Sequence, residues 1–206
     1  MKVCDWADHD ADGGKRYRHY KLQQTASPLT FEERWDCWKC ALINLFVWNA
    51  VFGMGLAYPI WLSRAPPAEW VWSTELPQLF FAFPVLTDLW FYGAHRIMHL
   101  PYFYRRIHKM HHKFHAPEAI AGVYCHPIEM IVVNAASMMV GPIVCGSHPI
   151  TWATWGAIAT ISVATSHSGY EMGTERHDMH HRDFNCNANF IQPANCSIYD
   201  ALQRLS

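Results

Sequence analysis

Three groups of histidines in this 206-residue chain have spacings that suit the binding of metal ions. The groups are His95 with His99, then His108, His111 and His112, and finally His177, His180 and His181. Helical side chains three and four residues apart lie on one face, about 5–6 Å from each other, so imidazoles at these spacings can converge on an ion. His167 precedes the third group by ten residues and is a further candidate ligand.

The number of histidines indicates a site for two ions. Twelve of the 14 histidines fall between positions 95 and 181, and this set is too large for one ion but large enough for two. Neutral imidazole binds zinc, copper, iron and nickel, so the ligand type alone does not select the metal. A hydrolytic zinc site would usually show an H-E-x-x-H pattern with its carboxylate base, and the sequence lacks that pattern.

The role of the remaining histidines stays open at this point. His126, in the stretch HPIE, is either a further metal ligand or a hydrogen-bond partner of one. The others lie outside the three groups, where ordinary hydrogen-bonded histidines are expected: His9, His19, His115 and His148.

Polar side chains beside the groups are candidates for holding the ligand imidazoles in the right tautomer. Glu129, Asp178 and Asn189 are the main candidates, and Asp178 is the best placed because it lies inside the third group. The alternative for each of them is a place on the surface or at a helix cap.

Composition limits the class of protein. A length of 206 residues predicts one domain, and a net charge of -1 gives no signal for a nucleic-acid partner. Cys37 and Cys40 form the single C-x-x-C among seven scattered cysteines, which favours reduced cysteines without a joint role.

Four apolar runs predict an all-α integral membrane protein with about four membrane segments. They cover residues 41–63, 70–92, 128–145 and 149–166, and the first has no charge over 23 residues. About 20 apolar residues cross a hydrocarbon core of roughly 30 Å. The alternative for the first run is a buried core helix. The last two runs are separated only by residues 146–148, which predicts a hairpin that enters and leaves on one side.

Basic residues predict the orientation in the membrane. Lys15 to Lys39 precede the first run, and five more surround the first two histidine groups, whereas the loop after the first run offers only Arg64. The positive-inside rule then places both termini and every histidine group, as a histidine-rich cap, in the cytosol. We expect a polar tail over residues 1–36, without a cleavable signal peptide, and a membrane-embedded catalytic domain over residues 37–206.

The membrane setting favours iron as the metal. A dinuclear iron centre activates O2 and can attack an unactivated C–H bond of a lipid, whereas zinc has no redox chemistry. Four basic residues lie next to the second histidine group: Arg105, Arg106, Lys109 and Lys113. They would attract an acidic electron donor, or they reflect the positive-inside rule and contact with anionic lipid headgroups.

The motifs DLWFYGAHRIMH, HKMHH, HPIE, HSGYE and HDMHH followed by NANF resemble the fatty acid hydroxylase/sterol desaturase superfamily of membrane di-iron oxygenases. HPIE, HPIT and HSGYE are most similar to the C-4 methylsterol monooxygenases, and FNCN is similar to cholesterol 25-hydroxylase. The resemblance implies an endoplasmic reticulum enzyme that hydroxylates a sterol or related lipid with O2 and two irons. It also implies electrons from NAD(P)H through cytochrome b5 and its reductase.

The resemblance implies nine ligands and one possible one. These are His95, His99, His108, His111, His112, His167, His177, His180 and His181, with His126 as the possible tenth. Two departures from the family pattern are the short interval MGTER before the last group and the tail IQPANCSIYDALQRLS. The alternatives are therefore a sterol or sphingolipid desaturase, a fatty-acid hydroxylase, and an inactive metal-binding paralogue or truncated product.

Overall fold

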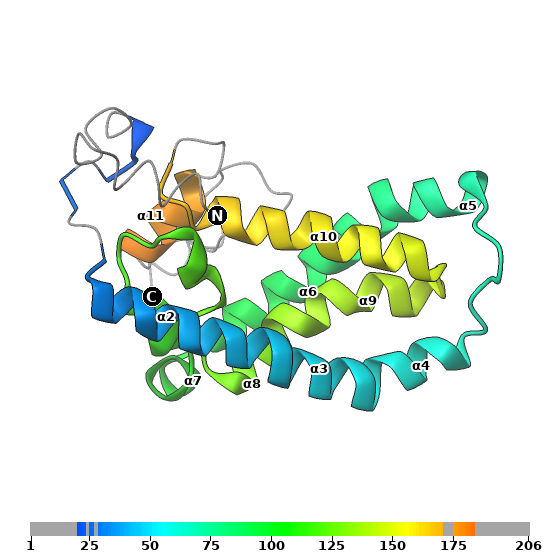
Figure 1. The fold of residues 1–206 in the computed structure, drawn as a ribbon, viewed down its shortest axis with the longest axis horizontal. Helices are drawn as coiled ribbons and strands as arrows, with labels where there is room; N and C mark the ends of the chain where they lie inside the picture. The colour runs from blue at the N-terminus through cyan, green and yellow to red at the C-terminus, as the bar shows by residue number, and fades with distance from the viewer. Residues whose placement is uncertain (1–19, 24, 27–28, 171–174, 184–206) are drawn as a thin grey trace, which may run out of the picture.

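The computed structural model describes residues 20–23, 25–26, 29–170 and 175–183, and over these residues the regular structure is helical (Figure 1). The one β-type feature among them is an isolated bridge between Lys21 and Tyr170. The all-α prediction is thus confirmed for the described part of the chain.

The first long helix runs from Phe31 to Ser63. It comprises α2 (Phe31–Ile43), η2 (Asn44–Trp48), α3 (Asn49–Phe52), η3 (Gly53–Ala57) and α4 (Tyr58–Ser63). A capping box starts it: the Glu33 N–H donates to Thr30 Oγ1 at 3.2 Å, and the Thr30 N–H donates to a Glu33 carboxylate oxygen at 2.9 Å. The helix therefore begins within residues 1–36, the stretch predicted to be a polar tail. The division into two domains stays a prediction.

The second long helix leads towards the histidines. It comprises α5 (Trp72–Pro77), η4 (Gln78–Ala82) and α6 (Phe83–Met98). Pro101 then starts the short helix α7 (Pro101–Arg106), because proline lacks an N–H and fits the first helical turn, where no N–H is needed. Two 3-10 helices follow, η5 (His108–Lys113) and η6 (Ala119–Val123).

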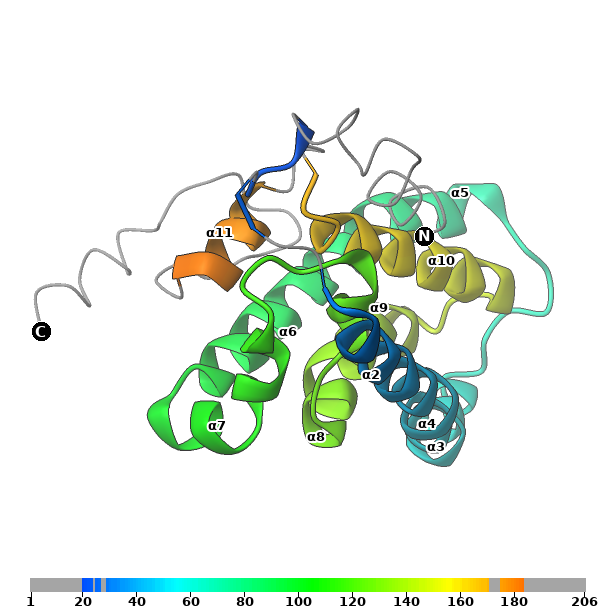
Figure 2. The same cartoon turned by 60° about the vertical axis from the view of Figure 1, so that its left-hand side comes forward.

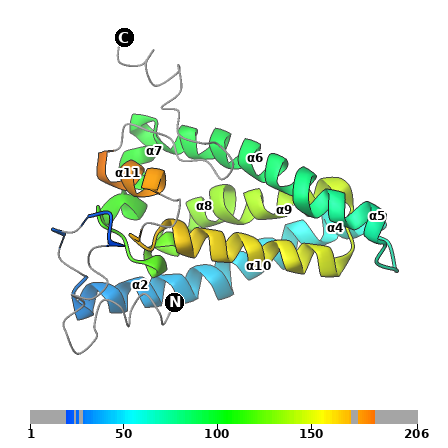
Figure 3. The ribbon, with the colours of Figure 1, turned by 90° about the horizontal axis from the view of Figure 1, so that it is seen from above.

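The last two long helices form the predicted hairpin. The first comprises α8 (Pro127–Glu129), η7 (Met130–Ala135) and α9 (Ala136–Cys145), and the second is α10 (Pro149–Ser166). Gly146 ends α9 in the left-handed conformation, with φ of 61°, which a glycine adopts without steric cost. Helix α9 is central, since it contacts α6, α10 and α4 (Figure 3).

Two of the described helices are long and apolar enough to cross a membrane, Phe31–Ser63 and Pro127–Cys145. Only 17% of the most apolar window of the first is buried, and Phe46, Val51 and Met54 are more than half exposed. A helix of a soluble core would be covered, so this surface suits lipid. Helices also occupy the other two predicted segments, but the number of four membrane segments stays a prediction.

Gly141 sets the close approach of α9 to α6. A methyl group at position 141 would lie 2.8 Å from Phe83 Cδ1 and 3.1 Å from Phe83 Cα, and Phe83 is fully buried. We expect Gly141→Ala to lower the free energy of unfolding by about 1–3 kcal/mol, as overpacking does. Denaturant titration in detergent measures this. The control is Gly156→Ala in α10, where a methyl group would meet nothing within 4 Å; equal stability of the two variants would contradict the prediction.

Candidate metal centre

Nine buried or half-buried histidines gather at one end of the bundle. They come from the end of α6, from η5, from the residue after α10 and from α11 (Glu175–Asp183), and these elements meet at the same end (Figures 1 and 2). Their ring nitrogens form two groups, in each of which the ligand atoms lie within 4.8 Å of one another. The five-histidine group is His95, His99, His108, His112 and His180, and the four-histidine group is His111, His167, His177 and His181.

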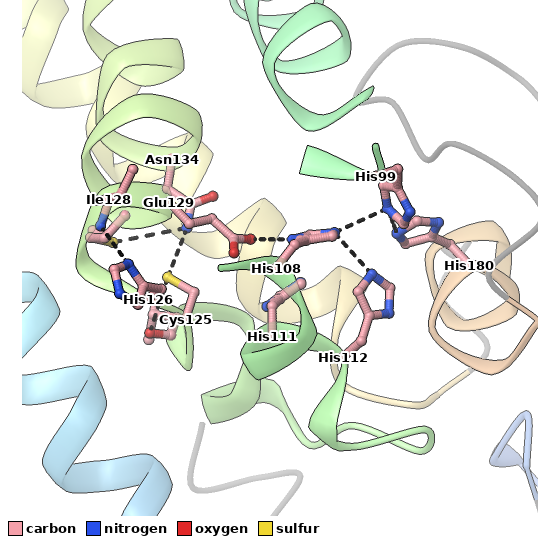
Figure 4. Close-up of polar contacts among 12 residues, drawn as sticks. His99, His108, His111, His112, Cys125, His126, Ile128, Glu129, Asn134 and His180 are labelled. Carbon is pink, nitrogen blue, oxygen red and sulfur yellow. Dashed lines mark hydrogen bonds and ion pairs between the residues drawn. The ribbon is translucent and has the colours of Figure 1, made fainter. Parts of the chain in front are cut away.

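The nitrogens of the five-histidine group are spaced like ligands of one ion (Figure 4). His108 Nε2 lies 3.0 Å from His99 Nε2 and 3.0 Å from His112 Nε2, and His99 Nε2 lies 3.2 Å from His180 Nε2. With metal–nitrogen bonds of about 2.1 Å, two ligands at right angles are about 3.0 Å apart and two at a tetrahedral angle about 3.4 Å. The observed separations fall in that interval.

The four-histidine group has a similar geometry. His167 Nε2 lies 2.7 Å from His177 Nε2 and 3.4 Å from His111 Nε2. His181 is fully buried, and among the described residues neither of its ring nitrogens has a hydrogen-bond partner. A buried nitrogen without a partner is costly unless it binds something, so this ring fits a ligand of a metal ion.

Hydrogen bonds behind the rings fix which nitrogen faces the centre. His108 Nδ1 lies 2.8 Å from the Glu129 Oε1 carboxylate oxygen, and His167 Nδ1 lies 2.8 Å from the Val163 carbonyl oxygen. The Val163 carbonyl can only accept, so in the neutral His167 ring Nδ1 carries the hydrogen and Nε2 offers its lone pair to the centre. An ionised Glu129 would fix the His108 ring in the same way. Glu129 thus lies where the predicted orienting role requires it, next to His108 and on the side away from His99 (Figure 4).

The two groups adjoin and share their segments. The neighbours His111 and His112 belong to different groups, as do His180 and His181. The ring centroids of His112 and His181, one from each group, are 4.7 Å apart. The two groups therefore fit two neighbouring metal ions.

Burial keeps these imidazoles neutral at physiological pH. Desolvation lowers the pKa of His99 to about 4, with a smaller effect of Arg96, and lowers that of His167 to about 4, against an ordinary value of 6.5. Burial likewise holds the pKa of His111, His177 and His181 well below the ordinary value. Neutral rings have free lone pairs, as metal binding requires.

These pKa shifts predict the acid sensitivity of the metal-free protein. Because the folded-state pKa lies below the unfolded value, the unfolded chain binds more protons once the pH falls below about 6.5. The stability contributed by neutral His99 and His167 is therefore present above pH 6.5 and lost as the pH falls towards about 4. Thermal unfolding of the metal-free protein across this interval checks the prediction. A melting temperature that stays constant from pH 7 to pH 4 would contradict it.

The structure does not bring every predicted site residue to the centre. His126 is in neither group: its Nδ1 accepts the Ile128 N–H at 3.2 Å and caps α8, on the far side of Glu129 from His99 and His180 (Figure 4). His148 accepts the Ile150 N–H at 3.1 Å in the same way. The motif His-Pro-Ile thus starts a helix at both places, and capping accounts for His126 without a metal.

The remaining two predicted residues are Asp178 and Asn189. Asp178 is buried and its Oδ2 accepts a hydrogen bond from Gln23 Nε2 at 3.1 Å. Asn189 lies outside the described residues.

Two residues that support the site were not predicted from the sequence. A methyl group on Gly122 would lie 2.9 Å from His167 Nδ1, so this glycine makes room for a ligand ring. Gln23 lies in the stretch predicted to be a polar tail. It contacts α11, which carries His177, His180 and His181, through Asp178. A lone glycine or glutamine carries no spacing signal, so only the tertiary contacts reveal these roles.

Comparison with known proteins gives a consistent result. The model of the family described as "Fatty acid hydroxylase" matches residues 80–202. C-4 methylsterol oxidase erg25 of Schizosaccharomyces pombe is 30% identical over 198 residues, which cover 83% of this chain and 62% of that protein. Methylsterol monooxygenase 1 of Rattus norvegicus is 30% identical over 81% of this chain and 61% of its own length.

A third relative matches a shorter region more strongly. Fatty acid hydroxylase domain-containing protein 2 of Homo sapiens is 41% identical over 107 residues, 50% of this chain and 32% of that protein. The chain thus spans less than two thirds of the length of these relatives. No solved structure matches it. The family match covers more than half of the chain and includes all nine clustered histidines, so the chain belongs to the fatty acid hydroxylase family.

Proposed function

We propose that this protein is a membrane oxidoreductase with two irons that uses O2 to hydroxylate a C–H bond of a sterol or a related lipid. The observation that carries the proposal is the sorting of nine histidines into two adjoining groups at the end of an apolar helical bundle. Family membership and the similarity to proteins named methylsterol oxidase and monooxygenase support the substrate class.

The donor set supports iron rather than zinc. Structural zinc sites are almost always tetrahedral with four ligands, whereas one group here offers five imidazoles. Imidazole also suits iron, which takes more than four ligands. Two irons, when bound, supply the O2 activation needed to insert one oxygen atom into an unactivated C–H bond.

The chain's own residues provide binding, orientation and a dry site. The nine imidazoles would hold the ions, while Glu129 and the Val163 carbonyl keep two of the rings in the binding tautomer. His108, His180 and His181 are fully buried, so bulk water is kept from this side of the ions. The exposed apolar surface of the long helices would keep the protein in the membrane that contains its lipid substrate.

Electron supply is part of the proposal. Cytochrome b5 and its reductase, fed by NAD(P)H, would deliver electrons at the exposed basic residues of α7 and η5, which are Arg105, Arg106, Lys109 and Lys113. An acidic donor would be attracted to this surface, most strongly at low salt. Arg105→Glu with Arg106→Glu should slow electron transfer at low ionic strength, and unchanged turnover would exclude docking there.

We place the protein in the endoplasmic reticulum membrane, as a multi-pass protein with both termini and the histidine cap in the cytosol. The basic residues Arg96, Arg105, Arg106, Lys109 and Lys113, which lie along the sequence between His95 and His115, support this orientation. Protease protection of sealed microsomes tests it with cleavage sites introduced beside α7. Protection of those sites from the protease would show that the histidine cap faces the lumen instead.

The deciding experiment combines metal analysis with turnover. Protein purified in detergent should contain about two irons per chain, and should consume O2 with a C-4 methylsterol and a reductant, yielding a hydroxylated product. A desaturated product would assign the alternative reaction at the same centre. Two irons without O2 consumption over a panel of sterols, fatty acids and sphingolipids would favour the inactive paralogue.

A further inference from the structure

Residues 20–23 form a strap beside the metal centre, attached to the chain segments that carry its histidines. Lys21 pairs with Tyr170 in the isolated antiparallel bridge, and the Leu22 N–H donates to the Gly169 carbonyl at 3.0 Å. The strap, blue in Figure 2, is thereby attached to Gly169 and Tyr170, two and three residues after His167.

Gln23 extends this attachment to two further histidine segments. Its Nε2 donates to the His115 carbonyl oxygen at 2.7 Å and to Asp178 Oδ2 at 3.1 Å. A side-chain amide carries two N–H donors, so both bonds form together. His115 follows η5 and Asp178 lies in α11. The Gln23 side chain therefore links the chain just after η5 to α11.

The two groups depend on α11 to different degrees. The five-histidine group takes one ligand from α11, His180, and four from α6 and η5. The four-histidine group takes two of its four ligands, His177 and His181, from α11. A displacement of α11 would leave the first group nearly complete and would halve the second.

We infer that Gln23 is a positioning residue that acts through Asp178 to hold α11, and with it His177 and His181, against the ion of the four-histidine group. The inference rests on the proposed function only in requiring that the two groups bind metal ions. Asp178 is buried beside His177, so the hydrogen bond from Gln23 reaches the ligand-bearing turn directly. Hydrogen-bond partners of ligand segments typically change metal affinity by about 10–100-fold.

The test is metal release from the full-length protein. Wild type and Gln23→Leu, which keeps the size but loses both donors, are loaded with Co(II) and with Fe(II) under anaerobic conditions and challenged with a chelator. We expect Gln23→Leu to release one of two ions about tenfold faster, and the other at close to the wild-type rate. The Co(II) absorption bands of the faster ion should also shift. Gln23→Arg, which restores N–H donors towards the Asp178 carboxylate, should restore slow release.

The matched control is Gln78→Leu, the same chemical change in η4 next to α5, outside both histidine groups. It should leave both release rates unchanged. In the Asp178→Leu background, Gln23→Leu should have no further effect, because the two residues act through one bond.

The outcomes separate this inference from the proposed function. Wild type that binds no stoichiometric metal refutes the proposed function. Wild type with two ions, combined with unchanged release or equal acceleration of both ions in Gln23→Leu, refutes the positioning role and leaves the proposed function intact.

Discussion

Replacing His181 with alanine is expected to remove about one of two metal ions per chain and to abolish turnover, because its group falls from four imidazoles to three. Replacing the adjacent His180 is expected to leave about two ions bound, although more weakly, because its group keeps four imidazoles. Both variants should lose turnover, since each substitution removes one ligand from one of the two ions.

Elemental analysis after gel filtration in detergent measures this difference. His126→Ala is the control, since that ring caps α8 and lies in neither group, so it should keep both ions. Equal metal loss in His180→Ala and His181→Ala would show that the two groups do not bind separate ions. Metal loss in His126→Ala would restore that residue to the ligand set.

Replacing Glu129 with alanine is expected to weaken metal binding by about 10–100-fold. The carboxylate is 2% exposed and its Oε1 lies 2.8 Å from His108 Nδ1. Without it the His108 ring loses the partner that fixes its tautomer and aims Nε2 at the centre. Glu129→Gln should lose less affinity, because the amide oxygen still accepts the Nδ1 hydrogen.

Competition with a chelator of known affinity measures the change. The control is Glu75→Ala, which also removes a buried carboxylate, but one that accepts the His148 N–H at the start of α10. That variant should lower the stability of the fold while the metal affinity of the folded protein stays at the wild-type value. If the two alanine variants weaken metal binding equally, the effect is one of general stability and the orienting role of Glu129 is refuted.

The sequence predicts which histidines cluster better than it predicts how they sort into two groups. Each pair four residues apart shares a group, namely His95 with His99, His108 with His112, and His177 with His181, as one helical face implies. Histidines three residues apart are divided between the groups: His111 is not in the group of His108, and His180 is not in the group of His177. Helical spacing describes one segment at a time, whereas the sorting depends on how α6, η5 and α11 face one another.

Local signals explain which parts of the fold were predictable. Residues 146–148 interrupt two apolar runs, and the structure has the hairpin there, with Gly146 in the left-handed conformation. A short helix is expected at the end of the polar stretch, but not that it starts at Phe31 and continues into the apolar run ten residues later. The capping-box residues Thr30 and Glu33 carry the signal for this start. The strap of residues 20–23 is not predictable from the sequence, because a polar stretch is typical of a tail and only the hydrogen bonds of Gln23 show that it is attached.

The uneven spread of the ligands along the chain bears on how the protein is made. Four ligands of the five-histidine group lie within residues 95–112, whereas the four-histidine group needs residues from 111 to 181. Short loops close at a lower entropic cost than long ones, and the N-terminal part of a chain leaves the ribosome first. A nascent chain could therefore take up an ion soon after residue 112 emerges, while the hairpin of α9 and α10 is still unmade. Under the proposed function, the four-histidine group would be filled only after α11 is made, so the two ions would enter at different stages of synthesis.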